Sequence, residues 1–390
     1  MKMTSRERVL RAIEGKSVDR VPMEFGGFIS GIVEGSKNSI AEGPPYGLGA
    51  LYEYCGIEDF PEPAISPVLS CVVNLDERLY ERLNSDVRHT FTGGYPFERL
   101  PDGMIRDMWG VLMKTEGFYN SVPDALTPLH NATSISDIAD YPDWPDPADP
   151  IFMQGVMESV KCYHEQTDKA VSLFPGYAGL IFHQYSWLRG FDKWLTDMYT
   201  NKKFYTYLAD KLTEIAIEII RNVFPKVGKN ADMILFGDDM GMQTQAFMSD
   251  DVYRKMVKPW CKRWVSETKR ILPHVKVQYH CCGSIYALIP DMIDVGFDII
   301  NPMQPLAQNM EAWRLKKDFG DRVCLHGGID IQRLVSFGTV KEIKHGVKTM
   351  CALMEGSRYI LACSHNIEPE TPPENIVAVF DAAIEYSEGK

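Results

Sequence analysis

The sequence predicts an α/β protein of the (β/α)8 TIM-barrel type with an irregular N-terminal elaboration, and three observations lead to this fold class. After Pro150, short apolar strand-like runs alternate with helical stretches, which is typical of parallel strands joined by helices. No Gly-x-Gly-x-x-Gly motif follows an early strand, as an open nucleotide-binding sheet would require. The length of 390 residues is long for one domain but suits a decorated barrel.

The first part of the chain predicts one helix, one strand and a long irregular region. Thr4 or Ser5 can cap a helix whose apolar residues share one face, and Gly15 ends it. Residues 18–30 have the pattern of a strand that ends in a Gly-Gly loop. Residues 30–150 are rich in Pro and Asp, and we expect them to form an elaboration over the barrel, with short strands of its own, within a single domain of residues 1–390.

The regular part of the chain predicts six further strands with helices between them. The strand-like runs are 170–176, 231–239, 275–283, 298–305, 323–330 and 359–366. The helical stretches are 151–165, 182–227 with breaks near Gly190 and Asn201, 250–272, 284–295, 310–319, 340–354 and 373–386. With residues 21–25 the count reaches seven strands, so one more strand hidden in the irregular region would complete the eight of a barrel.

Composition excludes several classes of partner. The net charge is −12, from 41 basic and 53 acidic residues, and no basic tract is present, so we expect no nucleic acid and no anionic membrane as partner. No apolar run approaches the roughly 18 residues that a transmembrane helix needs. The charged, amphipathic N-terminal stretch lacks the apolar core of a signal peptide, and the nine cysteines are scattered and odd in number. These features predict a cytoplasmic protein with reduced thiols.

The strand-like run 275–283 ends in a histidine and two cysteines, and it predicts half of a metal site. His280 and Cys282 are two residues apart, so they share one side of a strand while Cys281 faces the other. One imidazole and one thiolate from the same strand end are two of the three protein ligands of a catalytic zinc. The third ligand should come from another strand end, and the last strand offers Cys363 and His365.

Acidic residues at other strand ends are candidates for supporting roles. Asp239 and Glu24 are expected to serve the site without being ligands, and Asp238 is a further candidate catalytic acid. Capping of the following helices is the alternative reading for each of them. The remaining polar residues at strand ends are Asn301, Gln304, His326 and Asp330.

Several stretches together resemble the uroporphyrinogen decarboxylase superfamily. They are RERVLRAIEGKSVDRVPM near the start, DMWGV, GDDMG (Gly237 to Gly241), YHCCG, NPMQP, GDRVCLHGGID and ETPPENI (Glu370 to Ile376). The resemblance implies a barrel, and it leaves two branches: metal-free decarboxylases, and methyltransferases that depend on zinc and a corrinoid.

The motifs favour the methyltransferase branch. The decarboxylases resemble this chain at His365, six residues before Thr371, but they bind a polycarboxylate with arginines in the first-strand loop, and residues 23–30 contain none. The methyltransferases carry His-x-Cys at a strand end, which His280 and Cys282 match, and a cysteine in the place that His365 holds here. Its position before Thr371 favours His365 as the third zinc ligand, with Cys363 as the alternative.

The resemblance therefore implies an enzyme that moves a methyl group between a small methylated substrate and a corrinoid. Methoxylated compounds are one substrate class that a zinc with two imidazole ligands would suit. No corrinoid-anchoring Asp-x-His-x-x-Gly motif occurs, so the expected cofactors are Zn²⁺ and a corrinoid (cobalamin) on a partner protein. The alternatives are a metal-free decarboxylase or lyase that uses Asp238 or Asp239 with His365 as acid and base, and a binding protein that has kept the barrel.

Overall fold

The structure is a computed structural model, and it describes residues 2–26, 31–32, 44–62, 64, 72–73, 75–91, 97–116, 119–175 and 179–389. Residues 27–30 and 33–43 lie outside the described residues, and with them the predicted Gly-Gly loop and the start of the predicted elaboration.

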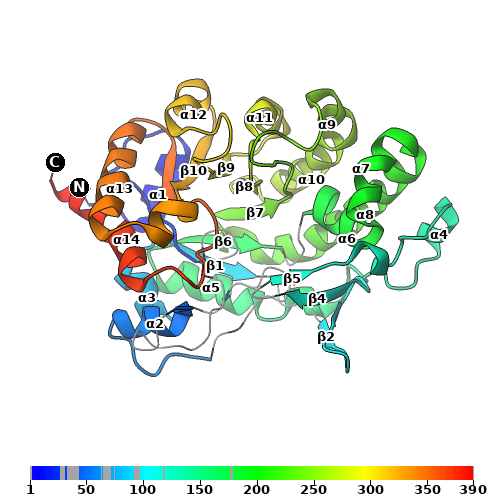
Figure 1. Cartoon of the computed structure of the whole chain (residues 1–390), viewed down its shortest axis with the longest axis horizontal. Helices are drawn as coiled ribbons and strands as arrows, with labels where there is room; N and C mark the ends of the chain where they lie inside the picture. Colours follow the sequence, from blue (N-terminus) through cyan, green and yellow to red (C-terminus); the bar gives the residue numbers. More distant parts are fainter. Residues whose placement is uncertain are drawn as a thin grey trace.

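A curled parallel sheet of seven strands forms the centre of the molecule (Figure 1). Its spatial order, β1-β6-β7-β8-β9-β10-β11, follows the chain, as expected when each helix returns the chain to the next parallel position. The strands are β1 (Val87–Phe91), β6 (Ala170–Phe174), β7 (Met233–Gly237), β8 (Lys276–His280), β9 (Ile299–Met303), β10 (Cys324–Ile329) and β11 (Tyr359–Cys363). The six strands predicted after Pro150 are confirmed, and β1 is the strand predicted to be hidden in the irregular region.

Residues 22–25 occupy the position between the two edges of this sheet. Met23 forms a parallel bridge to Leu361 of β11, and the Glu24 N–H donates to the Leu361 carbonyl at 2.9 Å. On the other side, the Asp86 N–H donates to the Met23 carbonyl at 2.8 Å, just before β1 begins. This segment therefore lies where the predicted first strand should lie, but it is an isolated bridge and not a strand.

Side chains explain why the eighth position is not a regular strand. The Met23 N–H donates to the Asp86 carboxylate at 2.9 Å, and the Phe25 N–H donates to the Ser85 hydroxyl at 3.1 Å. Backbone donors that bond to side chains are not available for a sheet ladder. The described residues thus form a curled α/β barrel that is not fully closed, where the sequence predicted eight complete strands.

A buried ion cluster anchors the segment 22–25 to the N-terminal helix. The Asp86 carboxylate is fully buried, and it accepts from Arg8 at 2.7 Å and from Arg20 at 2.7 and 2.8 Å. Because Asp86 also holds the Met23 N–H, the cluster determines where Glu24 enters the barrel.

Helices lie around the outside of the sheet (Figure 1). The breaks predicted near Gly190 and Asn201 are confirmed, since both residues interrupt helical runs. No helix in the described ranges has the length and apolar character needed to cross a bilayer. The helices are α1 (Ser5–Ile13), α2 (Gly47–Tyr54), α3 (Glu77–Arg82), α4 (Ile135–Ala139), α5 (Val156–Gln166), α6 (Tyr185–Arg189), α7 (Phe191–Thr200), α8 (Lys202–Val227), α9 (Asp250–Met256), α10 (Lys258–Ile271), α11 (Ile289–Val295), α12 (Ala312–Phe319), α13 (Val340–Met354) and α14 (Pro373–Glu388).

The irregular region contains a small antiparallel sheet, as the sequence predicted. Its strands are β2 (Phe97–Arg99), β3 (Ile105–Asp107), β4 (Leu112–Glu116) and β5 (Tyr119–Ser121), paired in that order. The buried Arg189 of α6 donates to the carbonyls of Leu129, His130 and Ala132 at 2.7–3.1 Å. These bonds fasten the end of the elaboration to the barrel helices.

Candidate metal centre

Three predicted ligands come together at the carboxyl ends of β8 and β11. His280 is the last residue of β8, Cys282 lies in the turn after it, and His365 follows the end of β11 by two residues. One ligand atom of each lies within 4.8 Å of the others, and His280 Nε2 is 3.1 Å from Cys282 Sγ. In the described part of the chain this is the only group of three or more His, Cys, Asp or Glu side chains with such spacing.

Two glycines allow the loops after β7 and β8 to hold Cys282 in place. Gly283 has φ +85°, and a Cβ atom there would lie 2.5 Å from the carbonyl carbon of Gly241. A Cβ atom on Gly241 would lie 2.4 Å from the Cys282 carbonyl oxygen. Only glycine permits this backbone-to-backbone approach, so the sequence of these two loops determines where the Cys282 thiol lies.

Asp239 lies beside the three ligands, and it also contacts His183. Its Oδ1 atom accepts from the Cys282 N–H at 2.8 Å and is 3.6 Å from His280 Nε2. Its Oδ2 atom is 3.3 Å from His183 Nε2. Burial acts to raise the pKa of Asp239, but the bond and charge of His183 outweigh it, so this pKa is lowered. Asp239 is therefore an anion that touches the cluster.

His183 is a titratable residue beside the site that the sequence analysis did not predict. Burial favours its neutral form, but the carboxylates of Asp238 and Asp239 outweigh burial and raise its pKa to about 9. It lies in the π-helical turn Leu180–Gln184 that follows β6, not at a strand end. A search that included the loops after the strands, and not only the strand ends, could have found it.

Asp238 has the contacts of a helix cap. Its fully buried carboxylate accepts from the N–H groups of Ile181, Phe182 and His183 at 2.9, 3.0 and 3.0 Å. These are the first donors of the helical turn that leads into α6, and such donors lack partners within the helix. Asp238 is therefore a cap, but of a turn that precedes β7 in the chain and not of the helix that follows it.

Glu24 is fully buried in the barrel and lies between two imidazoles, away from the three ligands. Its Oε2 atom is 3.2 Å from His326 Nε2, and its Oε1 atom is 3.6 Å from His89 Nε2. Neither contact has regular hydrogen-bond geometry, so the attraction is electrostatic. Burial acts to raise the pKa of Glu24, but the two imidazoles outweigh it and this pKa is lowered.

The protonation states of the three ligands suit a metal. Burial lowers the pKa of His280, and it lowers the pKa of His365 to about 4 with a further contribution from His280. Both imidazoles are then neutral near pH 7 and can donate a lone pair. Burial and the charge of Asp239 raise the pKa of Cys282, so a metal that binds here displaces the thiol proton.

The donor set fits zinc. Two imidazole nitrogens and one thiolate are ligands that Zn²⁺ prefers, at about 2.0–2.3 Å, and three protein ligands leave a fourth position for substrate. Ligand atoms separated by 3.1 Å, as in His280 and Cys282, can both reach one ion at those distances. A thiolate in the set disfavours Mg²⁺ and Ca²⁺.

Cys363, the alternative third ligand, lies deeper in the barrel. It is the last residue of β11 and is buried, and burial raises its pKa to about 12. It is not part of the group of three, whereas His365 is. A buried thiol of this kind behaves as a small apolar side chain.

A cavity of about 450 Å³ opens onto Cys282 and His365. This volume is in the range of small-molecule sites. The lining is mixed: three glutamines, Ser364 and Glu368 are polar, and Met242, Phe247 and Ile331 are apolar. The described lining thus presents amides and apolar surface to a ligand that reaches the cluster.

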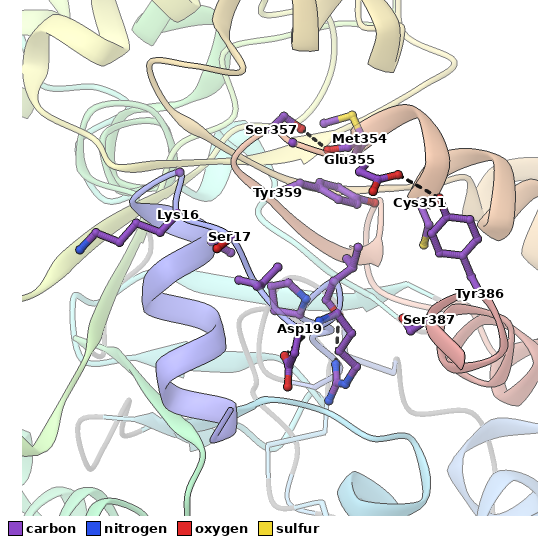
Figure 2. Close-up of a pocket in the computed structure, with 17 residues that line it drawn as sticks. Lys16, Ser17, Asp19, Cys351, Met354, Glu355, Ser357, Tyr359, Tyr386 and Ser387 are labelled. Atoms are coloured by element: carbon purple, nitrogen blue, oxygen red, sulfur yellow. Dashed lines mark hydrogen bonds between the residues drawn. The ribbon is translucent and has the colours of Figure 1, made fainter. Parts of the chain in front are cut away.

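A second cavity, of about 440 Å³, lies at the amino-terminal end of β11, where residues 15–22 pass the end of α13 (Figure 2). Its polar side chains are engaged with neighbours: Asp19 accepts from Arg8 at 2.6 Å, and the Tyr386 hydroxyl donates to Glu355 at 3.4 Å. Catalytic groups of parallel barrels gather at the opposite, carboxyl end of the strands. The cavity beside His365 is therefore the candidate active site.

The fold and the cluster define an α/β barrel protein with a candidate metal centre at the carboxyl ends of its strands. The uroporphyrinogen decarboxylase (URO-D) family model matches residues 119–386, and the chain belongs to this family. The resemblance that the sequence motifs indicated is thereby confirmed.

Relatives of two kinds are similar to the chain. Methylcobamide:CoM methyltransferase MtaA of Methanosarcina barkeri is 27% identical over 236 residues, which cover 59% of this chain and 63% of the relative. Uroporphyrinogen decarboxylase of Chlorobaculum parvum is 27% identical over 180 residues, which cover 45% and 48%. The matches thus span less than two thirds of either relative.

A solved structure shows the same fold over nearly the whole chain. A methyltransferase from Methanosarcina mazei superimposes with a TM-score of 0.64 at 20% identity, covering 99% of both chains. This likeness supports a common barrel architecture.

Proposed function

We propose that the chain is a zinc-dependent methyltransferase that moves a methyl group between a small methylated substrate and a corrinoid carried by a partner protein. The observation that carries the proposal is the group of His280, Cys282 and His365 at the mouth of a cavity. The similarity to MtaA, whose name states methyl transfer from a methylcobamide, supports the same class of reaction.

The chain's own residues would hold the metal and leave one side of it open to the cavity. His280 and His365 would ligate as neutral imidazoles and Cys282 as a thiolate, with Asp239 fixing the Cys282 backbone. Bound zinc would supply a Lewis acid that lowers the basicity of an oxygen leaving a methyl group. Two neutral ligands and one thiolate leave a net positive charge on the ion, which suits an ether or alcohol oxygen and so a methoxylated substrate.

The cavity lining argues against the metal-free decarboxylase alternative. Its described residues include Glu368 and no arginine or lysine. A porphyrinogen with many carboxylates would meet no compensating charge on these residues. A polar but uncharged methyl donor suits glutamines and apolar side chains better.

Methyl exchange with a free corrinoid tests the proposal. The zinc-loaded protein is mixed with cob(I)alamin and a panel of methoxylated aromatics, and the absorbance change to methylcobalamin is followed. The methyl group passes from oxygen to cobalt(I), which becomes methylcobalt(III), and the oxygen takes up a proton. The reverse reaction is followed with methylcobalamin and the demethylated phenols.

We expect zinc-dependent exchange that falls to background in Cys282→Ala. Exchange that survives removal of zinc would contradict the proposal, and so would decarboxylation of a porphyrinogen by the zinc-free protein in the absence of exchange.

A further inference from the structure

A line of buried polar side chains runs from His280 across the barrel interior. His280 Nδ1 bonds to Asn301 Oδ1, and Asn301 Nδ2 is 2.6 Å from His326 Nδ1. His326 Nε2 faces Glu24 Oε2 at 3.2 Å. Asn301, His326 and Glu24 have no exposed surface, and they come from β9, β10 and the segment 22–25.

We propose that Asn301, His326 and Glu24 are positioning residues that hold His280 in the tautomer protonated on Nδ1, so that the lone pair of Nε2 faces the metal position. The proposal rests on the proposed function for its purpose, because a ligating imidazole needs that tautomer. It adds three residues that touch neither the cavity nor the metal position.

The hydrogen bond between His280 and Asn301 determines which ring nitrogen of His280 carries the proton. A carbonyl oxygen only accepts, so His280 Nδ1 must donate to Asn301 Oδ1. The neutral ring then carries its lone pair on Nε2, the atom that is 3.1 Å from Cys282 Sγ. Reversal of the Asn301 amide would put the proton on Nε2 and block ligation.

The second bond determines which way the Asn301 amide points. Its Nδ2 only donates, so His326 Nδ1 must accept. The His326 proton is then on Nε2, which faces the Glu24 carboxylate. Each group in the line therefore depends on the next one.

Glu24 is the last group of the line, and its ionised carboxylate can accept hydrogen bonds but cannot donate one. The imidazoles of His326 and His89 lower its pKa against the effect of burial, and burial lowers the pKa of His89 itself. The 3.2 Å contact between Glu24 and His326 lacks regular hydrogen-bond geometry, so an ionised Glu24 favours the His326 N–H on its side through its negative charge. A neutral amide at position 24 could donate or accept, and it would leave both amide orientations of Asn301 open.

The buried imidazoles around Glu24 do not form a second metal site. Among the residues that the structure describes, only His280, Cys282 and His365 form a group of three whose ligand atoms all lie within 4.8 Å of one another. The location of Glu24 between His326 and His89 is thus explained by a positioning role and not by metal binding.

The tautomer of His280 in the zinc-free protein is the direct test. Nitrogen-15 labelling of histidine and long-range proton–nitrogen NMR distinguish Nδ1–H from Nε2–H rings, with His280→Gln used for assignment. We expect His280 to be protonated on Nδ1 in the wild type and to show both tautomers in Glu24→Gln. A wild-type ring protonated on Nε2 would overturn the proposal whether or not zinc binds.

Zinc affinity, measured by competition with a chromogenic chelator, is the second readout. Asn301→Leu and Glu24→Gln should each weaken zinc binding by about 10–100-fold, the usual loss when a partner of a ligand is removed. Gln278→Leu is the matched control, since Gln278 is a buried amide on β8 with no hydrogen bond among the described residues. Equal affinities for Asn301→Leu and Gln278→Leu would overturn the proposal.

A double variant separates positioning from misfolding. In Glu24→Gln/Asn301→Asp the new carboxylate can only accept from His280, so the Nδ1–H tautomer should return. Lack of this rescue in a folded double variant would count against the mechanism. If the wild type shows the expected tautomer but binds no zinc, the proposed function fails and the positioning of His280 stands.

Discussion

The Nε2 atom of His280 lies 3.1 Å from the Sγ atom of Cys282, although Cys281 stands between them in the chain. Cys281 points the other way, and its Sγ accepts from the Met240 N–H at 3.2 Å. Just beyond β8, Cys282 therefore faces the cavity while Cys281 packs in the interior.

The pair of variants His365→Ala and Cys363→Ala tests which residue completes the site. His365→Ala should lower zinc affinity by at least about 10–100-fold, because removal of a residue that only hydrogen-bonds to a ligand already costs that much affinity. Cys363→Ala should keep its zinc and lose about 1 kcal/mol of stability from a small buried void. Chelator competition and chemical denaturation measure the two effects. Zinc lost from Cys363→Ala but kept by His365→Ala would indicate a thiolate-rich site and a thiol as methyl acceptor.

The variant Asp239→Asn tests whether the charge of Asp239 serves the site. Asparagine can still accept from the Cys282 N–H, so the loop should keep its shape, but the negative charge beside His280 and His183 is lost. We expect methyl exchange and zinc affinity to fall by about tenfold, as for other groups that orient ligands. Unchanged zinc content and unchanged turnover would leave Asp239 with a structural role only.

The stability of the protein should depend on pH through His183. Its pKa is raised to about 9 by Asp238 and Asp239, against about 6.5 in the unfolded chain. The stabilisation is therefore fully present below pH 6.5 and is lost as the pH rises through 9. In His183→Gln this dependence should be absent, so the difference in unfolding free energy between wild type and variant should shrink from pH 6 to pH 9.5 by on the order of 3 kcal/mol. A difference that is constant over this range, measured by urea denaturation, would contradict the ion pair.

The buried ion cluster that holds the segment 22–25 should contribute far more to the free energy of unfolding than a surface ion pair does. Asp86→Ala removes the buried carboxylate that Arg8, Arg20 and the Met23 N–H share, and of its two carboxylate partners Arg8 keeps only Asp19. Loss of one member of a buried ion pair costs about 3–5 kcal/mol. Asp381→Ala is the control, since it breaks an exposed, two-pronged pair with Arg82 that should contribute less than about 1 kcal/mol. Denaturation midpoints compare them, and equal losses would rule out the anchoring role of Asp86.

Most of the barrel could be predicted from the sequence because its strands are buried on both faces. Runs such as 359–363 are continuously apolar, and this pattern separates them from the helices between them. The pattern of β1 is less apolar, because this strand carries Arg88 and His89, whose burial depends on partners elsewhere in the chain. The open eighth position could not be predicted, since it depends on Asp86 and Ser85 taking backbone donors.

The ligand cluster could also be predicted, because histidine and cysteine recur at the carboxyl ends of two strands, where barrel sites gather, although Cys282 and His365 lie just beyond β8 and β11. The line from His280 to Glu24 could not be, although Asn301 and His326 were recognised at strand ends. Their contacts depend on the register of neighbouring strands, which pairs His280 with Asn301. This register depends on the packing of the whole barrel, so the sequence of a single strand does not determine it.

The zinc content of the purified protein tests the central claim most directly. Elemental analysis of the wild type should give one zinc per chain, and Cys282→Ala, prepared in parallel, should give close to none. The two imidazoles alone would bind the ion too weakly to survive purification. A wild type without zinc, or a Cys282→Ala variant that retains it, would contradict the metal centre and with it the proposed zinc-dependent methyl transfer.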